Sequence, residues 1–503
     1  MFGLPVAYNK LSILNISIKT LLSRKWVNQC TPKKIDIAFL RNLAINVHRL
    51  LLICNDLLRF LLKIAKNRLF LRSKRKYFDI MKISIKKIKV GGITNIKDVE
   101  IPMEKLTALV APNNYGKSNF LVAIEFAVQF MAAQSDTRLK MMSTRNVIPI
   151  NKSMEDAPFS FEMDGCTGDT EFVYGFSFEW ARTNGKDQGS RVVSETLKLK
   201  QASELKYKAY IKREATELAY IIATSKGRCN KEVLVDRGTL VMDKLLNMDG
   251  LFYLDVVKAI RSMNVKRVNT LDNPDGIFSS PYPASGSGGY SVSFPKPGEI
   301  GFFINSLRQL DVDKYELLKN TIVDLLPNIE DFEPVQVDLS PKTDVPFQLP
   351  NTYFDIRVKE RYNNQYTSIN NVSTGSKKIL YVLTMSLAAS LNHVDLLMFE
   401  ELENSVHPRL LQNLLQVVTE LAGNTKVITT SHSPYLVKYL SPSNIQLGLP
   451  THSGVAEFRA IKPSKVNKVL RQASAEEVSI GEYLFDMMLD AEADDEMLNE
   501  YFA

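Results

Sequence analysis

Cysteine is scarce in this sequence, and long uncharged apolar runs are missing. The four cysteines, Cys30, Cys54, Cys166 and Cys229, form no CxxC pair and lack the spacing of a disulfide framework. This usage is typical of a reducing cytoplasm and disfavours a structural zinc site. The apolar runs stay below the roughly 18 residues needed to cross a bilayer, and no charged-then-apolar leader opens the chain. These absences predict a cytoplasmic protein without a membrane span.

Positive charge is missing from most of the chain, although the formal net charge is +8. Residues 1–80 hold 16 Lys and Arg against 3 Asp, so the other 423 residues hold 47 basic and 52 acidic side chains, a balance of −5. A mildly acidic body argues against extensive contact with nucleic-acid phosphates. The length of 503 residues leaves room for two or three domains.

The basic extension, residues 1–80, has two open interpretations. Its apolar segment LLLICNDLLRFLLKI and its cluster RSKRK fit a basic amphipathic helix that touches nucleic acid or an anionic membrane surface. Alternatively, the extension is not part of the functional protein, because a regular strand pattern begins at a second methionine, Met81.

The first motif that carries chemistry is APNNYGKS, residues 111–118. It follows the apolar strand pattern LTALV and precedes a helical pattern, which is the context that a phosphate-binding loop requires. Lys117 is predicted to reach the phosphates and Ser118 to hold Mg²⁺. The leading glycine of the pattern is replaced by Ala111, which leaves binding intact if this position needs no positive φ. The predicted nucleotide-binding residues of the loop are Ala111, Pro112, Asn113, Asn114, Tyr115, Gly116, Lys117, Ser118 and Asn119.

The second motif is LLMFEELENSVHP, residues 396–408, in which an apolar strand pattern ends in paired carboxylates. Parallel α/β sheets place their ligands at the carboxyl ends of strands. We expect Glu400 to hold Mg²⁺ through its water shell and Glu401 to orient or deprotonate the attacking water. Because side chains alternate along a strand, Glu401 is expected on the opposite face from Glu400.

Two further motifs carry weaker signals on their own. NVSTGSKKILYVLTMSLAAS, residues 371–390, has a Ser-Thr-Gly turn before an apolar helix and by itself indicates an ordinary N-cap. KVITTSHSPYL, residues 426–436, has a strand pattern that delivers His432. A single histidine is usually structural, but this one follows a strand of the same predicted sheet and should reach the same edge.

Together, the four motifs resemble those of ABC-type ATPases of the SMC, RecF and OLD group, which are often classed with AAA ATPases. The resemblance covers residues 81 to about 440 and implies an α/β fold: an ABC-type P-loop NTPase head with a mixed sheet, flanking helices and an inserted α+β region. In that family APNNYGKS is similar to Walker A, STGSKK to the signature, MFEELENSVHP to Walker B with the D-loop, and TTSHSP to the switch histidine.

The resemblance also implies cofactors, roles and a partner. ATP and Mg²⁺ are the cofactors, Glu401 and His432 are catalytic, and Ser118 and Glu400 hold the metal. Two subunits sandwich two ATP molecules head to head. In this dimer, Ser373 and Gly375 contact the nucleotide that the other subunit binds.

Three positions depart from the family pattern: Ala111, Thr374 and Glu400, which stands where aspartate is commoner. The glutamine of the Q-loop is not placed by the sequence.

The leading function is an ATP-binding and ATP-hydrolysing switch in phage defence or genome maintenance. OLD relatives carry a Toprim nuclease, but the 71 residues after His432 contain no DxD, so a nuclease or toxin activity is expected in a separate effector. The alternative is a RecF-like DNA-binding clamp in DNA repair. The signature and the ENSVHP continuation disfavour a membrane transporter subunit.

Five segments are predicted: the basic extension 1–80, the first part of the ATPase head 81–135, an inserted region 136–365, the second part of the head 366–450, and an acidic tail 451–503. Helical patterns are expected around residues 203–225, 252–263 and 302–326, a hairpin at Asn363-Asn364, and a Gly/Ser/Pro-rich loop at 273–298. EFVYGFSFEW predicts a strand whose aromatic face serves either the sheet core or base stacking. The tail is either a docking helix or a solvated terminal helix, with apolar positions Tyr483, Leu484, Phe485, Met487 and Met488.

Overall fold

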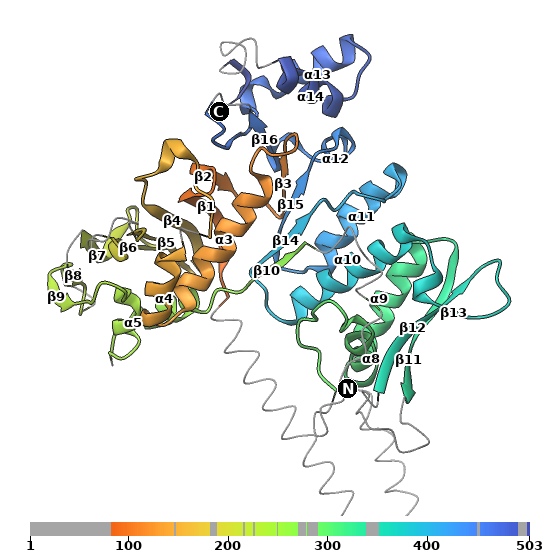
Figure 1. The fold of residues 1–503 in the computed structure, drawn as a ribbon, viewed down its shortest axis with the longest axis horizontal. Coiled ribbons are helices and arrows are strands. Elements are labelled where there is room, and N and C mark those ends of the chain that lie inside the picture. Colours follow the sequence, from red (N-terminus) through yellow and green to blue (C-terminus); the bar gives the residue numbers. More distant parts are fainter. Residues whose placement is uncertain are drawn as a thin grey trace, which may run out of the picture. The chain divides into compact units, whose positions relative to one another are not determined.

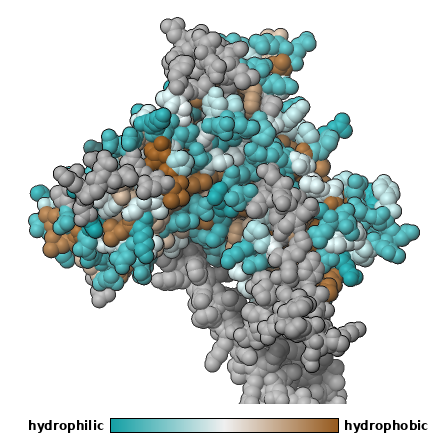
Figure 2. Space-filling view, viewed as in Figure 1, coloured by the Kyte–Doolittle hydropathy of each residue, from teal (hydrophilic) through white to brown (hydrophobic). Residues whose placement is uncertain are grey.

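The computed structural model (Figure 1) describes residues 82–502 apart from 145–146, 182–188, 215–216, 225–226, 249, 270–277, 279–289, 339–351, 450–452 and 491–499. The basic extension and most of the Gly/Ser/Pro-rich loop therefore lie outside the described residues. Within the described ranges, no helix is long and apolar enough to cross a membrane. On the face drawn in Figure 2, hydrophilic side chains predominate and apolar ones form limited groups.

A six-stranded sheet with the order β10-β14-β15-β3-β16-β17 carries the motifs. Its strands from β10 to β16 are parallel, and β17 is antiparallel. β3 is buried along its whole length and β14 along all but its last residue, which explains why both read as continuous apolar runs. The bounds are β3 Leu106–Val110, β10 Val265–Val268, β14 Leu396–Glu400, β15 Lys426–Ser431, β16 Ile445–Leu449 and β17 Glu457–Arg459.

An eight-stranded antiparallel sheet has the order β2-β1-β4-β5-β6-β7-β8-β9. It joins β1 and β2, from the predicted first part of the head, to strands of the predicted inserted region. Conversely β10, from that inserted region, belongs to the six-stranded sheet. The bounds are β1 Ser84–Ile93, β2 Ile96–Pro102, β4 Phe159–Thr167, β5 Thr170–Glu179, β6 Arg191–Gln201, β7 Lys208–Glu214, β8 Leu218–Ile221 and β9 Lys231–Leu234.

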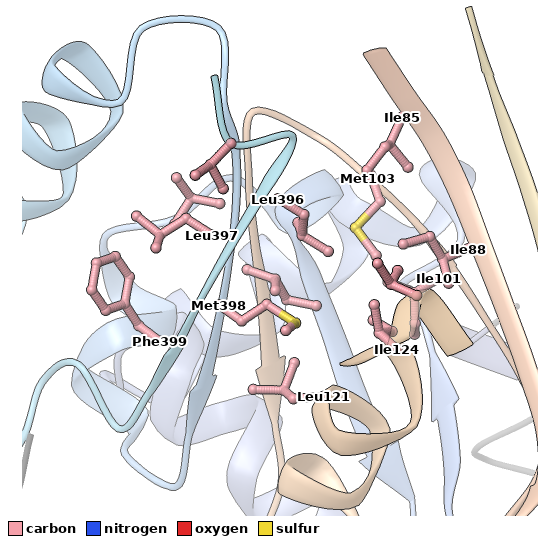
Figure 3. Packing of buried hydrophobic residues seen from close by; sticks show 14 of the residues in the cluster. Ile85, Ile88, Ile101, Met103, Leu121, Ile124, Leu396, Leu397, Met398 and Phe399 are labelled. Atoms are coloured by element: carbon pink, nitrogen blue, oxygen red, sulfur yellow. The ribbon is translucent and has the colours of Figure 1, made fainter. Parts of the chain in front are cut away.

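The helix α3 (Lys117–Ala132) packs between the two sheets. Figure 3 shows part of this core, with side chains of β14 on one side of α3 and those of β1 and β2 on the other. The aromatic face of β5 is buried, and its rings stack on Phe130 of α3 and contact Phe126 at a tilted angle. Of the two uses predicted for this face, the sheet core is therefore confirmed.

The helix predicted around residues 203–225 is wrong, because β7 and β8 occupy this stretch. β7 pairs with β6 and buries Tyr210 and Ile211, so tertiary pairing overrides the local helical pattern. The helix predicted at 302–326 is two helices, α8 (Ile300–Leu310) and α9 (Val312–Leu325). They are separated by Asp311, whose carboxylate caps α9 by accepting the Lys314 N–H at 3.2 Å.

The remaining predicted elements are confirmed where the structure describes them. α6 (Leu254–Arg261) occupies the helix predicted at 252–263, and β12 and β13 form the predicted antiparallel hairpin. This hairpin and β11 make a three-stranded sheet against which α8 and α9 pack. The bounds are β11 Ile329–Asp338, β12 Thr352–Glu360, β13 Thr367–Ser368, α4 Ser135–Met142, α5 Val241–Leu245, α10 Thr374–Leu391, α11 Pro408–Leu421 and α12 Pro434–Lys438; the 3₁₀ turns are η2 Lys152–Met154, η3 Ile369–Asn371, η4 Pro442–Asn444 and η5 Pro463–Lys465.

The acidic tail folds back on its own chain. α13 (Val466–Ala475) and α14 (Ile480–Asp490) follow β17, and α14 packs against α12. Tyr483, Leu484 and Met487 are buried there. Neither interpretation of the tail holds for these three residues, because this chain already covers the apolar side chains that were expected to dock a partner or to face solvent.

Candidate functional site

The predicted motifs meet at the carboxyl ends of three neighbouring parallel strands. β15 lies between β14 and β3, and the register pairs Glu400 with Thr430 and Ser431 with Val110. The loop after β3, the glutamates at the end of β14 and His432 after β15 therefore share one edge of the sheet. This edge is where open α/β sheets bind their ligands.

The loop of residues 111–116 begins with a backbone bond from the Ala111 N–H to the Ser431 carbonyl, at 3.2 Å. Gly116, directly before α3, has a φ of +88°, and a Cβ there would lie 2.7 Å from the Cβ of Ala456. Only glycine fits this position. Ala111 is not among the described residues with positive φ, so the condition for its tolerance is met. Asn114 does have positive φ, +68°, a conformation that asparagine tolerates.

Lys117, the first residue of α3, is buried at the loop. Its Nζ donates to the carbonyl oxygens of Ala111 and Pro112, both at 2.8 Å. Burial lowers the pKa of Lys117, and the nearby carboxylates of Glu401 and Glu403 partly oppose that effect. The two loop carbonyls therefore hold the ammonium group of Lys117 beside the loop that leads into α3.

Ser118 and Glu400 meet as predicted for two metal-holding residues. The Ser118 hydroxyl donates to Oε2 of Glu400 at 2.6 Å. The other oxygen, Oε1, accepts from Nη1 of Arg267 on β10 at 2.8 Å, and Nε of Arg267 donates to Glu125 of α3 at 2.8 Å. Arg267 and Glu125 were missed because neither belongs to a motif, and only the pairing of β10 with β14 brings Arg267 beside Glu400.

Glu401 lies beyond β14 in a left-handed conformation, with φ of +50°. Its N–H donates to the Thr430 carbonyl at 3.0 Å, and its own carbonyl accepts from Nζ of Lys378 at 2.8 Å. We expected the alternation of side chains along β14 to turn Glu401 away from Glu400. This reason is wrong, because β14 ends at Glu400 and Glu401 lies in a turn. Its side chain nonetheless has partners of its own: Asn404, whose Nδ2 donates to Oε2 at 2.5 Å, and His432, whose Nδ1 lies 3.4 Å from Oε1.

The third glutamate and the His-Pro pair have structural partners. Glu403 is buried, which raises its pKa, and it accepts a hydrogen bond from Ser431 at 2.5 Å. His407 caps α11 because its Nδ1 accepts the Arg409 N–H at 3.2 Å, with Pro408 at the first helical position.

Ser373 and Gly375 lie at the start of α10. The Ser373 hydroxyl caps the helix by accepting the Ser376 N–H at 3.3 Å. A Cβ on Gly375 would come within 2.6 Å of the Ser405 carbonyl, so this helix start packs closely on the segment after Glu401. Gly375 packs on that segment, and among the described residues no identified hydrogen bond joins Ser373 or Gly375 to Lys117.

The donor set suits a nucleotide with its metal. A hydroxyl and a carboxylate at 2.6 Å are ligands that Mg²⁺ takes in proteins, directly or through water. The loop, the start of α3 and Lys117 are the groups that bind phosphates. The residues present therefore fit ATP and Mg²⁺.

The fold and the site are similar to those of α/β P-loop ATPases. In agreement, residues 265–438 match the family described as "AAA domain, putative AbiEii toxin, Type IV TA system". This match covers the signature, Walker B and switch-histidine motifs and leaves the phosphate-binding loop outside it. No curated protein matches the sequence significantly.

Among solved structures, the chain is similar to SMC heads. One is an SMC head bound to the C-terminal winged-helix domain of ScpA, with 13% identity and a TM-score of 0.39, covering 76% of this chain and 99% of that one. Another is the SMC head domain from Thermotoga maritima, with 12% identity and a TM-score of 0.34, covering 75% and 99%. A third is the SMC head with an extended coiled coil bound to the C-terminal domain of ScpA, derived from Pyrococcus furiosus, with 12% identity and a TM-score of 0.37, covering 78% and 100%.

Proposed function

We propose that this chain binds Mg-ATP, dimerises on it and hydrolyses it, and that this cycle works as a switch. The observation that carries the proposal is the placing of Glu400 with Ser118 beside Lys117, while Glu401 contacts Asn404 and His432. Lys117 and the loop hold the phosphates, and Ser118 and Glu400 hold the metal. Glu401 accepts a proton from the attacking water, and His432 orients that water and Glu401.

The start of α10 supports the proposed dimer. Ser373 and Gly375 are available at a capped helix N-terminus, which is a suitable contact for the phosphates bound by a second subunit. On the same helix, Lys378 donates to the carbonyl of Glu401 of the same chain. Docking of a second subunit on the start of α10 would therefore affect the position of Glu401 in the chain that carries this helix.

For the biological role we propose phage defence or genome maintenance together with a separate effector. The family description names a toxin of a type IV toxin–antitoxin system, which supports a defence role. The RecF-like clamp is the competing prediction. It requires DNA binding that weakens steeply with salt, because phosphate contacts release counterions.

The first test is Lys117→Ala, which should abolish ATP binding because the phosphates lose the cation that the loop positions for them. Lys105→Ala is a matched control. Burial also lowers the pKa of Lys105, and its Nζ also donates to two carbonyls, those of Gly423 and Thr425, but it lies before β3, at the other end of that strand. Calorimetry should show lost binding for Lys117→Ala and normal binding for Lys105→Ala. Unchanged affinity in Lys117→Ala would refute the nucleotide site.

A further inference from the structure

Arg267 connects two carboxylates at the predicted metal site. It bonds to Glu400 through Nη1 and to Glu125 through Nε, both at 2.8 Å, and its side chain is only 21% exposed. Glu125 and Ser118 are seven residues apart on α3, so they share the helix face that looks toward β10 and β14. Two elements thus hold Arg267 in place: its own strand and the helix of the phosphate loop.

Both oxygens of Glu400 are engaged in this structure. Oε2 accepts from Ser118 and Oε1 accepts from Arg267. A divalent cation that approaches Glu400 meets a guanidinium already paired with it. Glu125, Arg267 and Glu400 together carry one negative charge, whereas the two carboxylates without Arg267 would carry two and attract a cation more strongly.

This arrangement also accounts for glutamate at position 400. The side chain must reach Ser118 on α3 and Arg267 on β10 at the same time, from the end of the strand next to β10. Glutamate is one methylene longer than aspartate, and this gives its carboxylate the additional reach to do so.

We propose that Arg267 acts as an internal cation that keeps bare divalent metal away from Glu400 before nucleotide binds, so that the metal enters only with the phosphates of a nucleotide. Arg267 is a positioning residue acting through Glu400, and Glu125 is the anchor that holds it. The proposal rests on the proposed nucleotide site, because it assigns Glu400 to the metal.

The direct test uses Mn²⁺ and no nucleotide, on the full chain, with bound Mn²⁺ followed by electron paramagnetic resonance. Arg267→Gln should bind one Mn²⁺ per chain at least about tenfold more tightly than wild type, and adding Glu400→Gln should remove this gain. Arg261→Gln is the matched control, because Arg261 also pairs with a carboxylate, that of Asp243 at 3.2 Å, and it donates to the Ala133 carbonyl at the end of α3 opposite to Ser118. It should bind Mn²⁺ as wild type does.

Two milder variants keep the proposal testable if Arg267→Gln does not fold. Arg267→Lys keeps the charge and should leave Mn²⁺ binding near the wild-type level. Glu125→Gln leaves Arg267 with one carboxylate, so Arg267 should pair more firmly with Glu400. The Mg²⁺ concentration needed for half-maximal ATP binding should then rise several-fold.

An Arg267→Gln protein whose Mn²⁺ affinity equals that of wild type overturns the proposal. So does a Glu125→Gln protein that needs less Mg²⁺ for ATP binding. A wild-type protein that binds no ATP defeats the nucleotide site instead, and the Mn²⁺ measurement still reports on Arg267.

Discussion

Glu400→Gln and Glu401→Gln make the same isosteric change at neighbouring positions and should have different effects. Glu400 contacts Ser118 and Arg267, whereas Glu401 contacts Asn404 and His432. If the two carboxylates do different jobs, the first substitution should impair binding and the second should impair hydrolysis alone.

The expected size of the Glu401→Gln effect follows from its contacts. A glutamine amide oxygen can still accept from Asn404, and the backbone bonds to Thr430 and Lys378 do not involve the side chain. Folding and ATP binding should therefore persist. Loss of the base should slow hydrolysis about 10²–10⁴-fold, which corresponds to about 3–5 kcal/mol in the barrier. The ATP-bound dimer should accumulate.

Glu400→Gln should act on binding and on stability. It removes the carboxylate that accepts from Arg267 at 2.8 Å, and a hydrogen bond to a charged group contributes about 1.5–3 kcal/mol. Because the side chains of Arg267 and Glu400 are 21% and 19% exposed, solvent screening should place the loss at or below the lower end of this range. Mg²⁺-dependent ATP affinity should fall together with turnover.

The assay compares both variants with wild type in Mg-ATP affinity by calorimetry, phosphate release, dimer fraction by light scattering, and melting temperature. A Glu401→Gln protein that hydrolyses ATP at the wild-type rate refutes the assignment of the base. Two variants that cannot be told apart refute the division of roles.

Three further predictions test other parts of the chain. Ser373→Arg should leave ATP binding by each subunit intact but prevent the ATP-dependent dimer; light scattering that still shows the dimer contradicts the role of the signature. A chain that begins at Met81 should keep its ATPase rate and melt at nearly the same temperature, and a large loss of either shows that residues 1–80 are integral. Burial raises the pKa of Asp395 to about 6, against roughly 3.9 unfolded, so its carboxyl destabilises the fold as pH rises through this window. From pH 4.5 to 7, urea unfolding should show wild type losing up to about 2 kcal/mol relative to Asp395→Asn; no change with pH would show that this buried carboxyl does not titrate with a raised pKa.

Sequence patterns within a few residues were enough to predict those parts of the site that lie in one short stretch of the chain. APNNYGKS lies between a fully buried strand and a helix that starts at Lys117, because the apolar run, the glycine and the helical pattern all act within a few residues. The paired glutamates at the end of an apolar run likewise marked a strand end. The aromatic alternation of β5 predicted a strand, since a period of two is a local property.

The errors arose where contacts with another element decide the conformation. Residues 203–225 read as helical, but β7 forms because β6 offers it a partner and a face on which to bury Tyr210 and Ile211. The tail read as a free amphipathic helix, but α12 covers its apolar face. In both cases the deciding contact is made with another element, and the pattern of the segment itself does not contain it.

The sequence by itself determined the class of this protein, because a phosphate-binding loop, a strand ending in carboxylates and a histidine after a further strand are each encoded locally. Only the tertiary structure decided what surrounds those groups. Glu401 is set by a left-handed turn held by Thr430 and Lys378, and Glu400 is paired with Arg267. The physical reason is that these contacts depend on strand order, and the parallel pairing of β10 with β14 brings together residues 133 positions apart.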